Sequence, residues 1–169
     1  VTTRAPRAYE KEGVHYFFRS RDDFEQMKEN DQLLEWACFC GNFYGTPKSY
    51  VEEKLAEGKN VILEIEVQGA LQVKKLYPKC VLVFTMPPSL EELKKRLTGR
   101  GTEDEKTIEK RIHRALEEID LVSHYDYIVI NDTIEQAIQD IDTIVRAEKR
   151  RSSRNGNVTK LFRGEIEPC

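Results

Sequence analysis

Closely spaced arginines are the feature of this sequence with the clearest chemistry. The chain opens VTTRAPR, so Arg4 and Arg7 stand three residues apart and Pro6 restricts the backbone between them. Two guanidinium groups held in one direction are well suited to binding a phosphate. A second basic group, interrupted by glycines, consists of Arg96, Arg100 and Arg111. Such a segment suits a lid that closes over transferring phosphates, although a solvated charged face would have the same composition.

Other side chains offer hydrogen bonds of defined polarity. Glu35 precedes Trp36 in a half-buried segment, and a carboxylate, which only accepts, suits a ligand edge with two adjacent N–H donors. Guanine has that edge and adenine does not, but an isolated glutamate is ordinarily a surface charge. The hydroxyls of Tyr16 and Tyr44 can donate to a phosphate or simply lie at the edge of a core. Thr46, between Gly45 and Pro47, is ordinarily a turn residue.

Two carboxylates lie in an otherwise apolar run. Glu64 and Glu66 alternate with apolar residues in the segment Val61–Val67. An unpaired buried carboxylate is unfavourable, so we expect these groups to face a ligand, a cation or an arginine. A structural ion pair is the alternative.

Composition excludes several classes of protein. The chain has 169 residues and a formal net charge of -3, which argues against a general nucleic-acid binder. No apolar run approaches the roughly 18 residues of a membrane span. The cysteines and histidines show no metal-ligand spacing, so we expect reduced thiols, no protein-bound metal and a cytoplasmic location. The basic residues near Arg150 resemble a solvated helix end.

The N-terminal third is predicted to be rich in hairpins. Strands are expected at 14–18 and 33–40, with Gly41 and Asn42 as the turn into Phe43 and Tyr44. Ser20 is the expected cap of a short helix. A further helix is expected over 48–57, ended by Gly58.

The rest of the chain alternates between strands and helices. Apolar strands are expected at 61–67, 80–86 and 127–130, which predicts a parallel sheet covered on both faces. Capping boxes are expected at Ser89 with Glu92 and at Thr102 with Glu105. Two helical stripes are expected to be buried: Ile108, Ile112, Ala115 and Ile119, and then Ile134, Ile138, Ile141 and Val145. The prediction is an α/β core with two insertions, one β-rich and one helical.

Several of these segments, taken in order, resemble the guanylate kinases. The similar motifs run over roughly residues 1–148 and look closest to bacterial members; they are TTRAPR at 2–7, GNFYGT at 41–46, LEIEVQG at 63–69, PPS at 87–89, the segment 96–102, Arg111, and IND at 130–132. The resemblance implies the fold of P-loop nucleoside monophosphate kinases. It divides the chain into a core (1–4, 48–92 and 121–169), a β-rich GMP-binding insertion (5–47) and a helical lid (93–120).

The resemblance also implies a reaction and a role for each matching residue. The reaction is transfer of the γ-phosphoryl group of ATP, carried with Mg²⁺, to GMP. The GMP phosphate would be bound by Arg4, Arg7, Tyr16 and Tyr44, the guanine by Glu35 and Thr46, and Glu64 would lie on the GMP or magnesium side. The lid arginines would be Arg96, Arg100 and Arg111, and Asn131 would lie near the adenine.

Two departures from the family pattern accompany the resemblance. Family members carry a Gly-rich phosphate loop upstream of the TTR motif. Because that motif begins at residue 2 here, we expect this chain to lack the loop, the strand before it and the helix after it. A missing upstream segment, a truncation and a natural loop-less relative are all open explanations. Glu66 stands where aspartate is common. A guanylate-kinase-like module that binds phosphorylated peptides is therefore the alternative to an enzyme.

Overall fold

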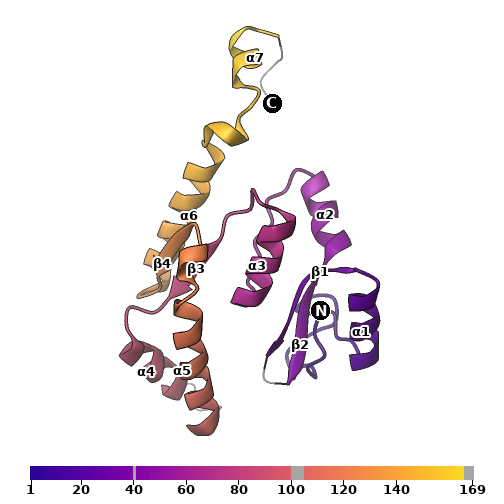
Figure 1. Ribbon diagram of the computed structural model, residues 1–169, viewed down its shortest axis with the longest axis vertical. Helices are drawn as coiled ribbons and strands as arrows, with labels where there is room; N and C mark the ends of the chain where they lie inside the picture. The colour runs from indigo at the N-terminus through magenta and orange to yellow at the C-terminus, as the bar shows by residue number, and fades with distance from the viewer. Residues whose placement is uncertain (40, 100–104, 166–169) are drawn as a thin grey trace. The chain divides into compact units, whose positions relative to one another are not determined.

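The computed structural model describes residues 1–39, 41–99 and 105–165, and the chain divides into two compact units. The first unit spans Val1–Leu82 and the second begins at Val83. Each unit is described by itself, with the element labels of Figure 1.

A two-stranded antiparallel hairpin organises the first unit. β1 (Leu33–Phe39) pairs with β2 (Asn42–Pro47), which confirms the predicted strand at 33–40 over its described residues. Asn42 already pairs with Phe39, so it belongs to β2 and not to the predicted turn of Gly41 and Asn42. The register shifts between Leu33 and Glu35, which marks an irregularity in β1.

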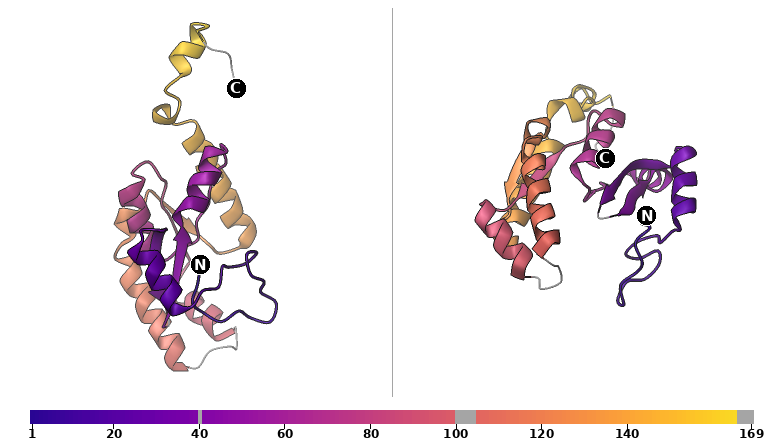
Figure 2. Two further views of the ribbon diagram at one scale, coloured as in Figure 1. Left: turned by 90° about the vertical axis from the view of Figure 1, so that its right-hand side faces the viewer. Right: turned by 60° about the horizontal axis from the view of Figure 1, so that its bottom comes forward.

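α1 (Arg21–Glu29) covers one side of this hairpin, as the views of Figures 1 and 2 agree. Ser20 caps the helix as predicted, because its Oγ accepts from the Asp23 N–H at 3.0 Å and the Asp23 carboxylate accepts from the Ser20 N–H. Phe24, with no exposed surface, packs with Leu33 and stacks on Phe43 at a ring-centroid distance of 5.3 Å. This is the first core of the unit.

The second core of the unit lies on the other side of β1. Leu34 packs there with Val51 of α2 (Lys48–Ala56) and Val73 of α3 (Val67–Leu76). α2 confirms the helix expected over 48–57, with Gly58 just after its last turn. α3 is fastened to β1 by the amide of Gln72, which accepts from the Trp36 N–H at 3.2 Å and donates to the Trp36 carbonyl at 2.9 Å.

Two strands predicted in this unit are not formed. Residues 61–66 are extended, and Val61, Leu63 and Ile65 pack against the second core, but among the described residues no neighbouring strand pairs with the segment. Alternating side chains make a segment extended, whereas a strand also needs a hydrogen-bonded partner. Residues 14–18 form turns with isolated bridges, one of which joins Phe18 to Thr2.

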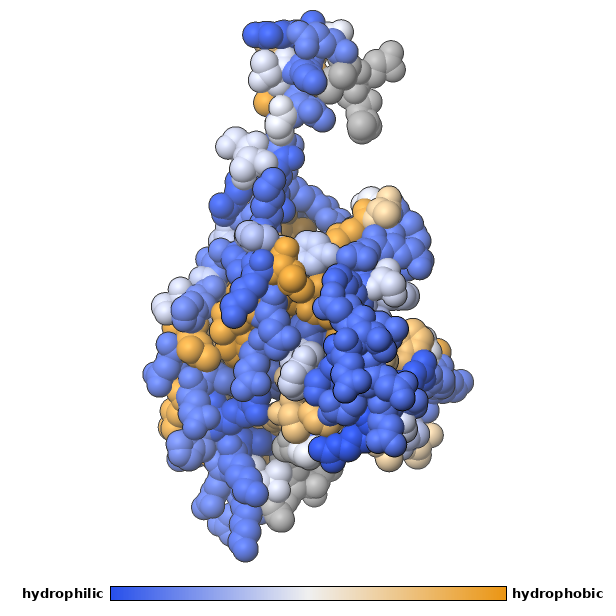
Figure 3. Space-filling model, turned by 45° about the vertical axis from the view of Figure 1, so that its right-hand side comes forward, coloured by the Kyte–Doolittle hydropathy of each residue, from blue (hydrophilic) through white to orange (hydrophobic). Residues whose placement is uncertain are grey.

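A two-stranded parallel sheet forms the centre of the second unit. β3 (Val83–Met86) pairs in register with β4 (Tyr127–Ile130), which confirms the predicted parallel arrangement. Val129 is 1% exposed, whereas Ile128 on the opposite face is 55% exposed, so the expectation that both faces are covered was wrong for this sheet. Apolar patches among hydrophilic side chains are also visible on the surface drawn in Figure 3.

The helices of the second unit follow the strands. α4 (Leu90–Gly99) and α5 (Glu105–Ile119) lie side by side (Figures 1 and 2), and the predicted stripe of α5 is half-buried. Ser89 accepts from the Glu92 N–H at 3.1 Å, which is half of the expected capping box, because the Glu92 carboxylate binds Arg96 instead. The box expected at Thr102 lies outside the described residues.

α6 (Ile134–Lys149) shields only part of the predicted stripe. Ile134 and Ile138 are exposed, Ile141 and Val145 are half-buried, and the buried residues are Ala137 and Glu148. Glu148 accepts from the Tyr127 hydroxyl at 2.7 Å, which is the main reason why its pKa is lowered, and from Arg151 and Arg154. These bonds connect β4 with α6 and with the short helix η2 (Ser152–Arg154). Two short helices complete the described part of the unit: η1 (Val122–His124) precedes β4, and α7 (Val158–Phe162) follows η2.

We predict that Phe24→Ala lowers the free energy of unfolding by about 3–5 kcal/mol, because it removes a fully buried ring from the first core. The matched control is Phe162→Ala, which removes the same atoms from a residue that is 91% exposed. Urea titration followed by circular dichroism measures both. Equal effects of the two substitutions would contradict the assignment of the core.

Candidate functional site

Two threonines bring the first predicted arginine to the hairpin. Thr2 is fully buried and donates from its hydroxyl to the Phe43 carbonyl at 2.9 Å, and Thr3 Oγ1 accepts from the Phe43 N–H at 2.9 Å. The Arg4 N–H donates to Thr2 Oγ1 at 3.1 Å. The TTR motif is therefore bound edge-on to β2, next to Tyr44.

Arg4 lies in a cluster with both predicted tyrosines. Its guanidinium carbon is 5.5 Å from the centroid of the Tyr16 ring, and the Tyr16 and Tyr44 rings are 6.3 Å apart. The bond to Glu10 is the main reason why the pKa of the Arg4 guanidinium is raised, and a contact with Tyr44 adds to the rise. Arg7 lies beside the cluster with its side chain 62% exposed, and it donates to the Tyr9 hydroxyl at 3.1 Å.

Glu10 joins the two arginines, and the sequence analysis missed it. Its carboxylate accepts from Arg4 Nη1 at 3.0 Å and Nη2 at 2.8 Å, and from the Arg7 backbone N–H at 2.7 Å. The bonds from Arg4, followed by the bond from Arg7, lower the pKa of Glu10 to about 2. The only signal in the sequence was an acid three residues after Arg7, a spacing that is common in loops.

The carboxylate predicted to recognise guanine is almost completely buried. Glu35 is 4% exposed, and its Oε1 accepts from the Thr46 hydroxyl at 2.6 Å. Burial is the dominant influence on the pKa of Glu35 and raises it, with the Thr46 hydroxyl acting in the opposite direction. Glu35 and Thr46 are partners in the β1–β2 register, so the hairpin itself brings these two residues together.

Glu64 does not join the cluster of Arg4 and the tyrosines. It lies on the exposed side of the extended segment 61–66, and the expectation that it faces a ligand, a cation or an arginine stays a prediction. Glu66 is the N-cap residue of α3. Among the described residues, no group of three His, Cys, Asp or Glu side chains is arranged to hold a metal ion.

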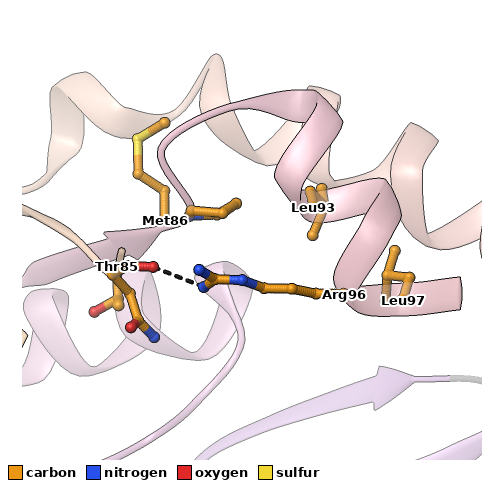
Figure 4. Close-up of a pocket in the computed structure, with 7 residues that line it drawn as sticks. Thr85, Met86, Leu93, Arg96 and Leu97 are labelled. Atoms are coloured by element: carbon orange, nitrogen blue, oxygen red, sulfur yellow. Dashed lines mark hydrogen bonds between the residues drawn. The ribbon is translucent and has the colours of Figure 1, made fainter. Parts of the chain in front are cut away.

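The second unit contains a separate cavity of about 190 Å³ at the carboxyl ends of β3 and β4. Figure 4 shows Arg96 extending from α4 toward the end of β3, and its dashed line marks a hydrogen bond to the backbone of Asn131. Arg96 donates from Nη1 to the Asn131 carbonyl at 2.6 Å and from Nη2 to the Asp132 carbonyl at 2.9 Å. Asn131 lines the same cavity, with Thr85, Met86, Pro87, Leu93 and Leu97.

The other two predicted lid arginines are described only in part. Arg111 lies on α5, the helix that packs against α4, and is half-buried. Arg100 lies outside the described residues. The contact of Arg96 with Glu92 was not predicted: the Glu92 carboxylate accepts from Arg96 Nε at 2.8 Å across one turn of α4. An acid four residues before an arginine on a helix was the signal for this contact.

Within the described ranges, no helix combines the length and apolar character that a membrane span requires.

Comparison of the sequence with known proteins identifies a family. The family model for guanylate kinase matches residues 1–148. The chain is 57% identical over 167 residues to guanylate kinase of Bacillus cereus (strain ZK / E33L), covering 99% of this chain and 80% of that protein. It is 54% identical over 154 residues to guanylate kinase of Desulfitobacterium hafniense (strain Y51), covering 91% and 77%.

The fold comparison agrees with the sequence comparison. The crystal structure of guanylate kinase from Anaplasma phagocytophilum superimposes with a TM-score of 0.80 at 34% identity, covering 98% of this chain and 83% of that chain. This chain belongs to the guanylate kinase family.

Proposed function

We propose that the protein transfers the γ-phosphoryl group of ATP to GMP, giving ADP and GDP. The observation that carries the proposal is the hydrogen bond between the buried Glu35 and the half-buried Thr46, on the hairpin that also carries Tyr44. Tyr44 and Thr46 are two residues apart on β2, so they face the same side of the sheet at a separation of about 7 Å. A nucleoside monophosphate likewise presents a base at one end and a phosphate at the other.

The base would be read by Glu35. Its carboxylate accepts hydrogen bonds from the N1–H and the 2-amino group of guanine, and the Thr46 hydroxyl helps at O6. Adenine lacks both donors at that edge and would leave a buried carboxylate unsatisfied, which is the stronger form of discrimination. Selectivity for GMP therefore follows from burial as much as from attraction.

The phosphate would be bound by Arg4, Arg7 and the hydroxyls of Tyr16 and Tyr44. Glu10 orients Arg4 through both of its terminal nitrogens and fixes the backbone of Arg7. A guanidinium that is already oriented loses less entropy when the phosphate arrives. Glu64, which is exposed, is placed by the proposal on the GMP or magnesium side.

The transfer step needs no strong base. At neutral pH the phosphate of GMP is largely a dianion, so one of its oxygens attacks the γ-phosphorus as the bond from that phosphorus to the bridging oxygen breaks and ADP leaves. Catalysis of this kind depends on positioning and on neutralising charge. We assign that neutralisation to Arg96, Arg100 and Arg111, and the vicinity of the adenine to Asn131.

Mg²⁺ would enter with ATP. Magnesium in kinases is held mainly by phosphate oxygens and water with one or two carboxylates, so the described part of the chain needs no cluster of protein ligands. Magnesium supplies positive charge to the transferring phosphates. The division into core, GMP-binding insertion (5–47) and lid (93–120) stays a prediction, as does a cytoplasmic location, where both nucleotides are abundant.

A phosphopeptide-binding module could use the same arginine and tyrosine cluster, but it has no use for a buried acceptor such as Glu35. GMP-dependent formation of ADP from Mg-ATP, with AMP as the control acceptor, distinguishes the two functions. Turnover with GMP and little or none with AMP is the expected result. Turnover with neither acceptor, together with binding of phosphorylated peptides, would overturn the proposal.

We predict that Glu35→Gln lowers the preference for GMP over AMP by roughly 10- to 100-fold, because it replaces a charged acceptor with an amide that presents one donor to the guanine edge. The ratio of kcat/KM for the two nucleotides measures this preference. Glu29→Gln, the same change on the exposed face of α1, is the matched control. An unchanged ratio in Glu35→Gln would refute the guanine-reading role.

We also predict that the preference for GMP falls with decreasing pH. Burial raises the pKa of Glu35 above its ordinary value of 4.5, and the two guanine donors favour the ionised form. Acidification through the raised pKa therefore protonates the acceptor and weakens GMP selectively. GMP and AMP carry the same phosphate, so the ratio of their affinities cancels its titration, and in Glu35→Gln this ratio should not change between pH 8 and pH 5.

A further inference from the structure

The space around the second oxygen of Glu35 is limited by α3. Thr46 holds Oε1, and Oε2 lies over Gly69 in the first turn of that helix. A Cβ atom built on Gly69 would be 2.3 Å from Glu35 Oε2 and 3.1 Å from Cδ. No real Cβ tolerates the first distance, so any side chain at position 69 must displace the carboxylate, the helix or both.

The backbone of Gly69 gives no reason for a glycine. Its conformation is helical, and in a helix glycine is less favourable than alanine. By contrast, a Cβ on Gly156 would meet no atom within 4 Å. The glycine at position 69 is therefore required by the space around it, and that space is occupied by the Glu35 side chain.

Of the two neighbours of this space, α3 is held more firmly than the Glu35 carboxylate. α3 is fastened to β1 by the paired hydrogen bonds between Gln72 and the Trp36 backbone, next to Glu35 itself. Val73, one residue further along α3, is buried in the second core with Leu34. On the other side, the carboxylate is held at 2.6 Å by Thr46. A methyl group at position 69 would act mainly on the carboxylate, because rotating one side chain disturbs fewer contacts than lifting a packed helix.

We infer that Gly69 is a positioning residue for guanine selection: its missing side chain creates the space for Glu35 Oε2 and thereby sets where the carboxylate presents its acceptors to the base. The inference rests on the proposed function, since it assigns a determinant of GMP specificity to a residue that has no side chain to contact the base. Gly69 acts only through Glu35. It is therefore expected to affect the choice of base and not the phosphoryl transfer.

The test is equilibrium binding of GMP and AMP to the full chain, measured by calorimetry on wild type, Gly69→Ala and Gly156→Ala. Gly69→Ala should weaken GMP by roughly 10-fold or more with a much smaller change for AMP, as expected when hydrogen bonds to a charged group are misplaced. Gly156→Ala, the same change in open space, should leave both affinities unchanged. The ratio of the two affinities does not depend on the folded fraction of a sample.

A second pair of variants keeps the test decisive if Gly69→Ala folds poorly. Glu35→Asp shortens the side chain by one methylene and withdraws the carboxylate from the space over Gly69. In the E35D background, adding Gly69→Ala should therefore not weaken GMP binding further, and the melting temperature should not fall, because alanine is the better helix former. Equal losses from Gly69→Ala in the wild-type and E35D backgrounds would overturn the inference.

The outcomes separate this inference from the proposed function. If wild type prefers GMP and Glu35→Gln abolishes that preference while Gly69→Ala retains it, the inference fails and the proposed function stands. If wild type binds GMP and AMP equally, the proposed function fails and the inference fails with it.

Discussion

Burial of the Glu35 carboxylate between the hairpin and α3 is the most demanding arrangement in the first unit. A carboxylate removed from water loses hydration that protein contacts rarely replace in full, and here the contact that partly replaces it is the Thr46 hydroxyl at 2.6 Å. The raised pKa of Glu35 reflects the shortfall. A ligand that brings two further N–H donors supplies the missing hydrogen bonds, whereas a ligand without them leaves the carboxylate unsatisfied. The cost of burying Glu35 in the free protein therefore favours the first kind of ligand over the second.

The rest of the first unit is arranged around that pair. The β1–β2 register makes Glu35 and Thr46 partners, and Gln72 fastens α3 over them. Thr2 of the TTR motif pairs with Tyr44, which is two residues before Thr46 on β2, and this pairing places Arg4 beside Tyr16 and Tyr44. Glu10 then orients Arg4, so the sites proposed for the base and for the phosphate both lie along β2.

In the second unit Arg96 is held mainly by backbone carbonyls. Arg96 spans from α4 to the backbone carbonyls that follow β4, and Glu92 holds its third nitrogen donor. The cavity beside it lies at the carboxyl ends of two parallel strands, the usual place for ligands in open α/β sheets. Backbone carbonyls cannot be replaced by mutation, so this anchor depends on the ends of the strands more than on neighbouring side chains.

The sequence by itself determined the chemical groups and the order of the elements. The Ser20 cap and the β1–β2 hairpin were predicted because each depends on local spacing, and the parallel pairing of β3 with β4 was predicted from apolar strands separated by helices. The roles given to the arginine pair, Glu35 and Thr46 stay predictions. Other predictions failed because they depended on which partner packs against a segment. Residues 61–66 are extended without a paired strand, and α6 buries Ala137 and Glu148 while Ile134 and Ile138 are exposed, since the buried face of a helix depends on what packs against it.

The direction of Glu35 was decided only by the tertiary structure. Simple alternation along a strand sends consecutive residues to opposite faces, yet Leu34 packs against Val73 of α3 and Glu35 faces Gly69 of the same helix. The irregular register between Leu33 and Glu35 allows both side chains to point the same way. Such an irregularity breaks the period of two that a single sequence would reveal, so only the packed structure shows that Leu34 and Glu35 both lie against α3.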